Sequence, residues 1–375
     1  MLCRRISPVQ QLQLLAPLLL LLLPLPALGQ QVCLEAAQRN ALLSFYSATG
    51  GPAWIRREKW NTSETCTWTH RNFDTSAPLT SYGTVDLPSH CCWDGVKCCV
   101  SEVDVPLFAS CTQYQCNCTI GLVTGLAVGR NGLTGRLEEA LSPAVLQDLG
   151  CELRLLFLGG NALSGPLPEA LTGLPDLRLL TVASNRLDGT LPASLSRLSL
   201  LEELDLSSNR LTGSVPRELC GGNTRFSPLR DLMLSNNNLT GELNLLECDS
   251  LINLDMQNNN LYGNLPDFSS YRQLHILRLG NNSFSGPISP PPFDLRMLVV
   301  LDLSDNYLTG TIPNLVGNGS HLTLVRLYGN LLTGSVPADI FSLGSLGNVM
   351  LQNNKLAGTL PENIGSRAGQ LAAPQ

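Results

Sequence analysis

The stretch LRLLFLGGNALSGPLP, residues 153–168, contains the pattern that decides the fold. Counted from Asn161 as an anchor, leucines lie at minus eight, minus five and minus three, and another leucine lies at plus two. The positions from minus eight to plus seven are filled by Leu153, Leu156, Leu158, Asn161, Leu163, Gly165, Leu167 and Pro168. Minus five and minus three are two residues apart, so on a strand they point inward together, whereas minus six, minus four and minus two point outward.

The same frame occurs ten times, with a spacing of about 24 residues. Its anchors are Asn131, Asn161, Asn185, Asn209, Asn237, Asn259, Asn282, Asn306, Asn330 and Asn354. All ten copies have glycine at plus four, and seven have proline at plus seven. Nine have leucine at plus two, and the other has Phe284. Such regularity predicts a solenoid in which each repeat buries its apolar residues against its neighbours.

The frame predicts an α/β-type solenoid of ten repeats whose short strands stack in parallel about 4.8 Å apart. The amide of the anchor asparagine can bond backbone groups that the turn after the strand would leave unpaired. The glycine at plus four suits a positive φ or a close backbone approach.

This frame, L-x-x-L-x-L-x-x-N-x-L-x-G-x-L/I-P, resembles the plant-type leucine-rich repeat over residues 121–361. Receptor-kinase ectodomains and polygalacturonase-inhibitor proteins carry similar repeats, and the longer N-terminal part also resembles algal and protist variants. The resemblance implies a right-handed superhelix with a parallel β-sheet on its concave face. It also implies a second short strand, on one flank, from the G-x-L/I-P part.

Two segments before the repeats resemble the disulfide-rich cap of that family. ALLSFYSATGGPAW (41–54) resembles its amphipathic helix, with Leu42, Leu43 and Phe45 on one side. CCWDGVKC (91–98) resembles its C-C-x-W-x-G-V-x-C element, although it is one residue shorter. By this resemblance Cys33 pairs with Cys91 and Cys92 with Cys98, while the other cysteines before the repeats and Cys151 allow many pairings.

One disulfide follows from the frame itself. Cys220 and Cys248 each lie eleven residues after an anchor, Asn209 and Asn237 respectively. Equal phase in adjacent repeats places them side by side, at the separation that a disulfide needs. We therefore predict a Cys220–Cys248 bond.

The first 29 residues are typical of a secretory leader, with cleavage expected before Gln30. Arg4 and Arg5 precede an apolar stretch at residues 12–25, which is shorter than a membrane-spanning helix and contains two prolines. The alternative is an uncleaved anchor. An oxidising compartment agrees with the cysteine-rich segment and with five N-x-S/T sequons. The sequons begin at Asn61, Asn117, Asn238, Asn281 and Asn318.

The predicted organisation is therefore a leader (1–29), a disulfide-rich cap (30–120), the repeats (121–361) and a short tail (362–375). No other segment is apolar enough to span a bilayer. The tail has no recognisable C-terminal cap. Either it folds over the open end of the solenoid, or the sequence is a shortened form of a longer protein such as a receptor.

Several function classes find no support in the sequence. The net charge of −6 comes without a basic patch interleaved with aromatics, so nucleic acid is not an expected partner. None of the four histidines belongs to H-E-x-x-H, and neither G-x-S-x-G nor a phosphate-binding loop is present. Asp302 and Asp305 fit a strand and a turn position of the frame. We expect no enzyme activity, no metal and no cofactor.

The outward strand positions on the concave face are the predicted binding surface. The candidate residues are Phe157, Glu203, Asp205, Asp231, Asp255, Arg278, Asp302, Arg326 and Tyr328. Charge alternates at minus four from Asp255 to Arg326. That alternation predicts a ladder of ion pairs, each contributing about 0.2–1 kcal/mol, or a charged recognition stripe, and the two are compatible.

The sequence thus predicts a secreted recognition protein whose concave face binds an extracellular protein, a peptide or a wall polysaccharide, with a membrane receptor as a further candidate partner. The alternative is a structural coat protein without a specific ligand. Ice binding requires a uniform row of residues, which the minus-two positions lack. No residue identifies polygalacturonase as the partner.

Overall fold

The structure is a computed structural model that describes residues 35–55, 66–71, 82–87, 96–98, 123–150, 152–220, 228–245, 248–288, 296–313 and 321–363. These residues belong to two compact units. The N-terminal unit lies within Met1–Ser164 and Ala170–Leu179, and the C-terminal unit within Gly165–Glu169 and Leu180–Gln375. The predicted leader lies outside the described residues, as does all of the predicted tail after residue 363.

In the N-terminal unit, helix α2 (Glu35–Ala48) buries Leu42 and Phe45 completely. The helix expected at 41–54 therefore begins and ends six residues earlier. It stops because Gly50 adopts a left-handed conformation (φ 72°) and the chain then enters the short 3-10 helix η1 (Gly51–Ala53). No helix in the described part of the chain is long and apolar enough to cross a bilayer.

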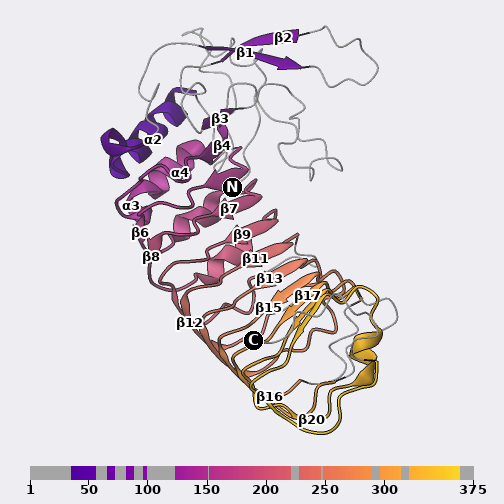
Figure 1. Cartoon of the computed structure of the whole chain (residues 1–375). Coiled ribbons are helices and arrows are strands. Elements are labelled where there is room, and N and C mark those ends of the chain that lie inside the picture. Colours follow the sequence, from indigo (N-terminus) through magenta and orange to yellow (C-terminus); the bar gives the residue numbers. More distant parts are fainter. Residues whose placement is uncertain are drawn as a thin grey trace, which may run out of the picture. The chain divides into compact units, whose positions relative to one another are not determined.

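Trp54 fixes the end of this helical segment. Its indole nitrogen donates a hydrogen bond of 2.9 Å to the carbonyl of Thr49. Its ring lies edge-on to Phe45 and Tyr46, with centroids 6.0 and 4.9 Å away. Helix α2 packs on α3 (Leu137–Ala140) and α4 (Pro143–Leu149), the two helices of the first repeat (Figure 1).

The strands of the N-terminal unit are antiparallel where they precede the repeats and parallel within them. β1 (Cys66–Arg71) pairs antiparallel with β2 (Tyr82–Leu87), and β3 (Val96–Cys98) pairs antiparallel with β4 (Val123–Ala127). β4 then pairs in parallel with β5 (Leu155–Phe157). Gln38 ties α2 to β4, because its side-chain oxygen accepts the Val123 amide at 2.9 Å.

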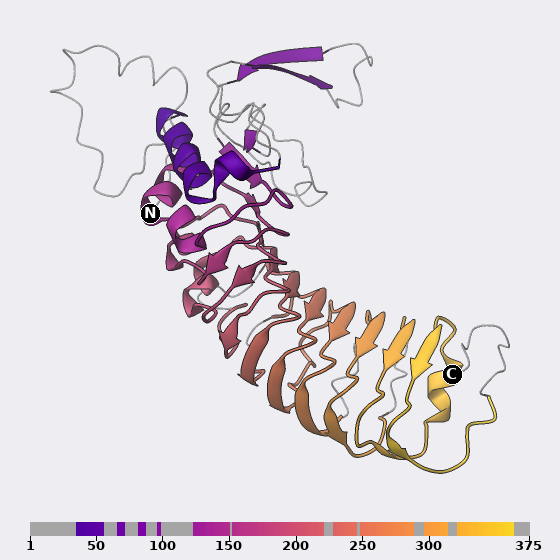
Figure 2. The ribbon, with the colours of Figure 1, turned by 60° about the vertical axis from the view of Figure 1, so that its left-hand side comes forward.

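The C-terminal unit contains a long parallel sheet, here called the strand sheet, in which successive repeats contribute successive strands (Figure 2). Its strands are β9 (Glu203–Asp205), β11 (Asp231–Met233), β13 (Asn253–Asp255), β15 (Ile276–Arg278), β17 (Val300–Asp302), β19 (Leu324–Arg326) and β21 (Asn348–Met350). Strand β7 (Leu179–Thr181) crosses the division between the units. The predicted parallel solenoid is thus confirmed.

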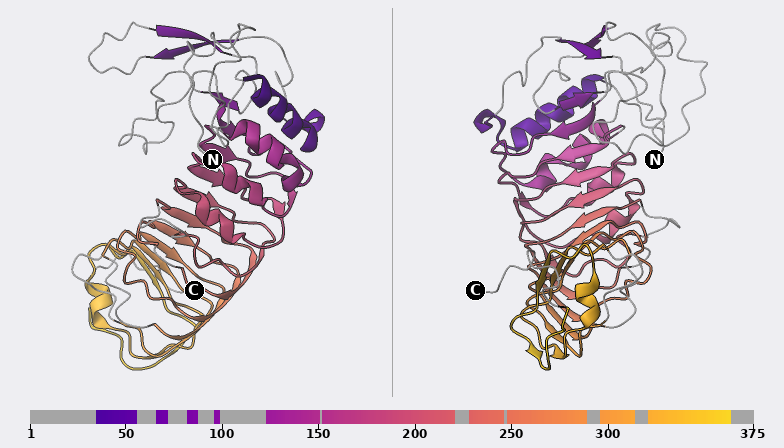
Figure 3. Two further views of the ribbon diagram at one scale, coloured as in Figure 1. Left: turned by 180° about the vertical axis from the view of Figure 1, so that it is seen from behind. Right: turned by 45° about the vertical axis from the view of Figure 1, so that its right-hand side comes forward.

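A second parallel sheet, the lateral sheet, forms from the residues after the anchors, as the resemblance implied. It consists of β10 (Thr212–Gly213), β12 (Asn238–Glu242), β14 (Asn260–Asn264), β16 (Ser283–Pro287) and β18 (Tyr307–Thr309). Shorter strands of the same kind are β6 (Ser164–Gly165), β8 (Arg186–Leu187), β20 (Thr333–Gly334) and β22 (Lys355–Leu356). The short 3-10 helices of the repeats (Figure 3) are η4 (Glu169–Gly173), η5 (Ala193–Arg197) and η6 (Ala338–Ser342).

The anchor asparagines connect neighbouring repeats in the predicted way. The side-chain nitrogen of Asn306 donates to the carbonyls of Leu279, Leu303 and Ser304 at 3.0–3.2 Å, and its oxygen accepts the Phe284 amide at 2.9 Å. Leu279 and Phe284 belong to the preceding repeat, so one buried side chain satisfies backbone groups of two repeats. The same set of bonds is made by Asn209, Asn237, Asn259, Asn282, Asn330 and Asn354.

Two positions in each turn have left-handed backbone. The glycine at plus four does so as expected, for example Gly286 with φ 77°. The residue immediately before the anchor does so as well, for example Asn281 with φ 54°, although the repeat frame did not predict this. Asparagine, aspartate and serine are frequent at this second position because short polar side chains tolerate that conformation.

The predicted disulfide in the repeats is confirmed. Cys220 and Cys248 are bonded, with their Cα atoms 5.1 Å apart, and both are buried. Cys33, Cys91 and Cys92 lie outside the described residues. Cys98 ends β3, but its side chain is not among those described, so the pairings Cys33–Cys91 and Cys92–Cys98 stay predictions.

Candidate ligand-binding surface

The outward residues of the strand sheet form one regular surface, which we call the strand face: the minus-six, minus-four and minus-two positions of β9 to β21. Strand β9 illustrates how the sequence builds it. Leu204 is completely buried, while Glu203 and Asp205 on either side are half-exposed. β11, β15 and β19 show the same alternation. The inward leucines therefore hold the sheet on the core and aim the side chains between them at solvent.

Three acidic residues occupy one part of the strand face: Glu203, Asp205 and Asp231, here called the acidic trio. Glu203 on β9 lies directly opposite Asp231 on β11 in the register of the sheet. Burial, then the charges of Asp231 and Asp205, raises the pKa of Glu203. Burial also raises the pKa of Asp231, against a hydrogen bond from Asn253 and the charge of Arg230. Like charges therefore face each other where water is partly excluded.

Asp205 is held by neutral donors. Its Oδ1 accepts the backbone amide of Ser207 at 3.0 Å and the hydroxyl of the same serine at 2.7 Å. Its Oδ2 lies 3.5 Å from the hydroxyl of Thr181. The residue opposite it on β11 is Met233, and Asp205 forms no ion pair within the described part of the chain. Its orientation is fixed while its charge is not neutralised.

A fourth acceptor adjoins the trio. Asn253 on β13 lies opposite Asp231 and donates a side-chain hydrogen bond to it. The side-chain oxygen of Asn253 is buried and has no hydrogen-bond partner among the described residues. Because this oxygen is enclosed, the acceptors that an incoming N–H or ammonium group can reach are the half-exposed carboxylates of the acidic trio.

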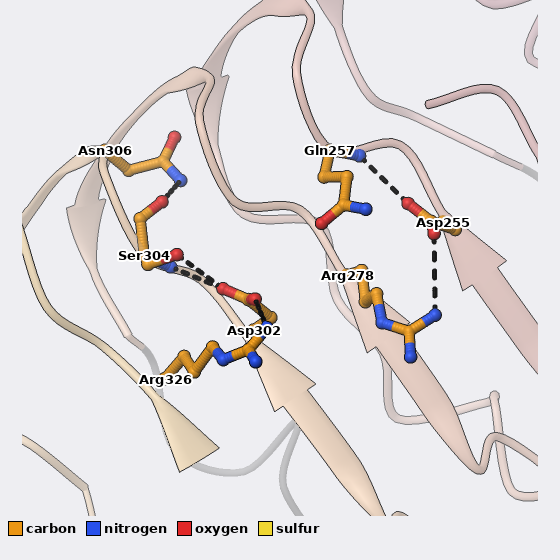
Figure 4. Close-up of polar contacts among 7 residues, drawn as sticks. All are labelled: Asp255, Gln257, Arg278, Asp302, Ser304, Asn306 and Arg326. Carbon is orange, nitrogen blue, oxygen red and sulfur yellow. Dashed lines mark hydrogen bonds and ion pairs between the residues drawn. The ribbon is translucent and has the colours of Figure 1, made fainter. Parts of the chain in front are cut away.

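Further along the strand face the acids have cationic partners (Figure 4). Asp302 on β17 is almost completely buried, and its Oδ2 lies 3.0 Å from Nη1 of Arg326 on β19. Its Oδ1 accepts the amide and hydroxyl of Ser304 at 3.1 and 2.6 Å. The carboxylate of Asp302 is thus fully engaged.

Asp255 and Arg278 form the second pair, more loosely. Oδ2 of Asp255 lies 3.6 Å from Nη1 of Arg278, and Oδ1 accepts the Gln257 amide at 3.3 Å. Burial raises the pKa of Asp255, while the Gln257 amide and Arg278 counteract it. Although Arg278 is also in register with Asp302, these two are not an ion pair among the described contacts. The predicted ladder is therefore two separate pairs.

The aromatic candidates differ from each other. Phe157, on β5 of the N-terminal unit, is 42% exposed and its ring lies directly over Gly129, where any Cβ would collide with it. Tyr328, on the strand face, was expected to be exposed and is only half-exposed. The backbone carbonyl of Tyr328 accepts the amide of Asp305, as the register of the repeats requires.

Two of the five sequons lie in the described part of the chain, and both asparagines are exposed. Asn238 begins β12 of the lateral sheet. Asn281 belongs to a ladder of exposed amides, in which Asn281 donates to Asn258 at 2.9 Å and Asn258 to Asn236 at 2.8 Å. Asn61, Asn117 and Asn318 lie outside the described residues.

This amide ladder and the exposed tyrosines of the lateral sheet, Tyr262 and Tyr307, were not predicted from the sequence. A signal existed for both. The ladder residues occupy the same position, minus one, in successive repeats. Tyr262 occupies plus three, where most repeats have serine or threonine, and Tyr307 occupies plus one, where no other repeat has an aromatic residue.

Comparison with known proteins identifies the repeat. The family described as "Leucine rich repeat" matches residues 151–211, and a second family with the same description matches residues 297–318. No curated protein matches the sequence significantly.

Solved structures give similar folds. The plant peptide hormone receptor RGFR1, in complex with RGF2, is 35% identical with a TM-score of 0.59, and the match covers 66% of this chain and 38% of the receptor. A TDR receptor is 31% identical with a TM-score of 0.51, covering 62% of this chain and 43% of the receptor. The chain therefore spans less than half of these two receptors. A plant ice-binding protein is 22% identical with a TM-score of 0.57, covering 89% and 98%, and shows the fold alone.

Proposed function

Because this chain carries leucine-rich repeats similar to those of plant peptide hormone receptors, we propose that it is an extracellular recognition protein whose strand face binds a basic peptide or protein segment. The basic segment would lie over the acidic trio. This proposal commits to one of the ligand classes that the sequence left open.

The observation that carries the proposal is the contrast in charge along the strand face. Asp302 and Asp255 each face an arginine on the next strand. Glu203 and Asp231 instead face each other, and Asp205 faces Met233. Like charges directly opposite on neighbouring strands cost stability, about 0.2–1 kcal/mol per pair. A lysine or arginine of a ligand would relieve this repulsion on binding, and the relief would increase the affinity for that ligand.

Geometry supports the same ligand class. Ser207 and Thr181 hold Asp205 in a fixed orientation, so a ligand cation would meet an ordered carboxylate. The half-exposed carboxylates of Glu203, Asp205 and Asp231 match the several N–H groups of an arginine or lysine side chain.

The extracellular location is part of the proposal. The leader-like N-terminus, the Cys220–Cys248 disulfide and the two exposed sequon asparagines agree with passage through an oxidising secretory route. The similar receptor RGFR1 was solved with RGF2 bound. A secreted binding protein and a piece of a longer receptor both satisfy these observations.

The test is the binding of basic peptides to the secreted protein and to a charge-neutralised variant. A library of short peptides containing lysine or arginine is screened by interferometry, beside acidic peptides of the same length. We expect selected basic peptides to bind, and Glu203→Gln with Asp231→Asn to weaken them at least about tenfold.

The matched control is Asp188→Asn with Asp249→Asn, which removes the same net charge from exposed positions off the strand face. This control is expected to keep the affinity of the native protein. Equal losses in both double variants would show that net charge alone attracts the peptides. Failure of every basic peptide to bind would favour the alternative of a coat protein without a specific ligand.

A further inference from the structure

The lateral sheet presents a surface that the proposed function does not use. On β14, Leu261 is completely buried while Tyr262 is 52% exposed. On β18, Leu308 is completely buried while Tyr307 is 58% exposed. Because side chains alternate along a strand, both tyrosines point away from the core on the same side of the sheet.

The two tyrosines flank one strand. Tyr262 is in register with Ser283 on β16, and Tyr307 is in register with Ser285 on the other side of β16. Two strand spacings and an offset of two residues place their Cα atoms roughly 12 Å apart. The two serines and two uncharged residues of β14, Asn260 and Asn264, share this outward surface.

The frame of the repeat does not require a tyrosine at either position. At plus three, Thr212 and Thr333 use their hydroxyls to bond the backbone carbonyl of the preceding repeat, both at 3.1 Å. Tyr262 occupies this position without making such a bond among the described contacts, and more than half of it remains exposed. A small polar residue would fit the fold at least as well as tyrosine does.

The surface around the tyrosines is low and carries one charge, on the exposed Glu242 of β12, which is in register with Tyr262. The side chain of Asn264 lies flat against Gly286, where any Cβ would collide with it. The outward residues of β14, β16 and β18 are asparagine, serine, threonine, tyrosine and proline, with no charged side chain among them. The strand face, in contrast, is rich in charge.

From this placement we infer that the lateral sheet is a second binding surface, for a neutral linear polysaccharide, with Tyr262 and Tyr307 as stacking platforms. The flat faces of pyranose rings carry C–H groups that pack on an aromatic ring, whose face is electron-rich. Amide and hydroxyl groups between the tyrosines can donate to and accept from sugar hydroxyls. Glu242 would repel an anionic polymer, and the outward residues of β12, β14, β16 and β18 include no cation to attract one, so this surface favours a neutral chain.

The test is affinity electrophoresis of the secreted protein in native gels that contain a mixed-linkage β-glucan, a galactomannan, a xylan or, as the charged comparator, polygalacturonate. Each protein is run before and after enzymatic removal of N-glycans, since Asn238 of the neighbouring β12 belongs to a sequon. We expect at least one neutral polymer to retard the native protein. Each tyrosine-to-alanine change should raise the dissociation constant about tenfold.

Three variants separate this surface from the rest of the molecule. Tyr262→Ala with Tyr307→Ala should abolish retardation, whereas Tyr262→Phe with Tyr307→Phe should keep it because the ring faces remain. Glu203→Gln with Asp231→Asn should leave retardation unchanged, because it alters the strand face only. Because both tyrosines are exposed, the two tyrosine double variants should melt at the native temperature.

Retardation of the double alanine variant to the native extent would overturn the inference. Retardation by polygalacturonate alone, or by none of the neutral polymers, would do the same. The inference does not depend on peptide binding by the strand face, so either proposal can fail without the other.

Discussion

Asp205 and Asp302 occupy the same position of their repeats and share two hydrogen bonds, although Asp302 is almost completely buried and Asp205 is half-exposed. Each accepts the amide and the hydroxyl of a serine two residues later. Across the sheet, however, Asp302 meets Arg326, whereas Asp205 meets Met233. A single residue in the next repeat thus decides whether an ordered carboxylate is neutralised internally.

The same scaffold therefore carries two kinds of surface in one unit. From β13 to β19, charge is paired within the sheet and contributes to holding repeats together. At β9 and β11, the acidic trio forms no ion pair among the described residues, and in our proposal its charge is met by a basic ligand. The frame residues fix the position of each strand, and the minus-six and minus-four residues determine the charge of the strand face. The surface charge can therefore change from repeat to repeat while the backbone stays the same.

The largest expected effect tests whether the two regions really share one scaffold. Asn209→Ala, beside the acidic trio, and Asn306→Ala, beside the paired acids, each remove a buried amide that makes four backbone hydrogen bonds. Each should lower the free energy of unfolding by at least about 3 kcal/mol, because buried backbone groups lose their partners. Urea denaturation followed by circular dichroism measures both. Costs differing by more than about 1 kcal/mol would contradict the shared scaffold.

The repeat frame that these asparagines anchor is also the part of the molecule that the sequence predicted best. The anchor, the glycine at plus four and the inward leucines recur so regularly that register, sheet and the Cys220–Cys248 bond followed from phase alone. The predicted end of helix α2 was wrong, because Gly50 stops the helix after residue 48. A single copy of a capping segment offers no repetition from which to correct such an error.

The strand face was predicted less completely, for a physical reason. Which residues point outward follows from the period of a strand, and the structure confirms that. Which outward charges actually pair depends on rotamers and distances of tenths of an ångström. Alternation from Asp255 to Arg326 suggested a continuous ladder, whereas Arg278 pairs with Asp255 and leaves Asp302 to Arg326.

The second prediction converts the paired region toward the unpaired one. Arg326→Met places at β19 the residue that Asp205 faces at β11. Asp302 would then be an almost fully buried carboxylate without a cation, supported by Ser304 only. Because the guanidinium is partly exposed, we expect a loss of about 1–2 kcal/mol in the free energy of unfolding at neutral pH. A cost below about 0.3 kcal/mol would mean that the pair contributes little.

The third prediction uses pH to separate the regions. Burial and the neighbouring acids raise the pKa of Glu203 above its ordinary value of 4.5, and burial raises that of Asp231 above 3.8. A carboxyl with a raised pKa in the folded state binds its proton more tightly there than in the unfolded chain. Its charge therefore lowers stability at neutral pH, and acidification through the raised pKa removes that penalty.

Glu203→Gln with Asp231→Asn should accordingly be more stable than the native protein at pH 7, by up to about 1 kcal/mol. The advantage should shrink as pH falls through the raised pKa values, and disappear below the ordinary values of 4.5 and 3.8. Thermal melting of both proteins across this range measures the difference. An advantage that does not change with pH would show that side-chain packing, not charge, causes it.

The smallest expected effect comes from converting the unpaired region toward the paired one. Met233→Arg places a guanidinium opposite Asp205, in the register that Arg326 has opposite Asp302. We expect a gain of about 0.5 kcal/mol in the free energy of unfolding, because the new pair is half-exposed. The same change should weaken the binding of any basic ligand, because the introduced guanidinium would occupy the place of the ligand's cationic group.

Met233 is also in register with Asp255 on β13, so a new arginine has two acids within reach. A double-mutant cycle with Asp205→Asn decides between them. If the stabilisation disappears in the Asp205→Asn background, the guanidinium pairs with Asp205, and the missing cation alone distinguishes the two regions. If it persists, Asp255 has attracted the arginine away from Arg278, and the acidic trio must owe its unpaired state to geometry as well as to the residue at position 233.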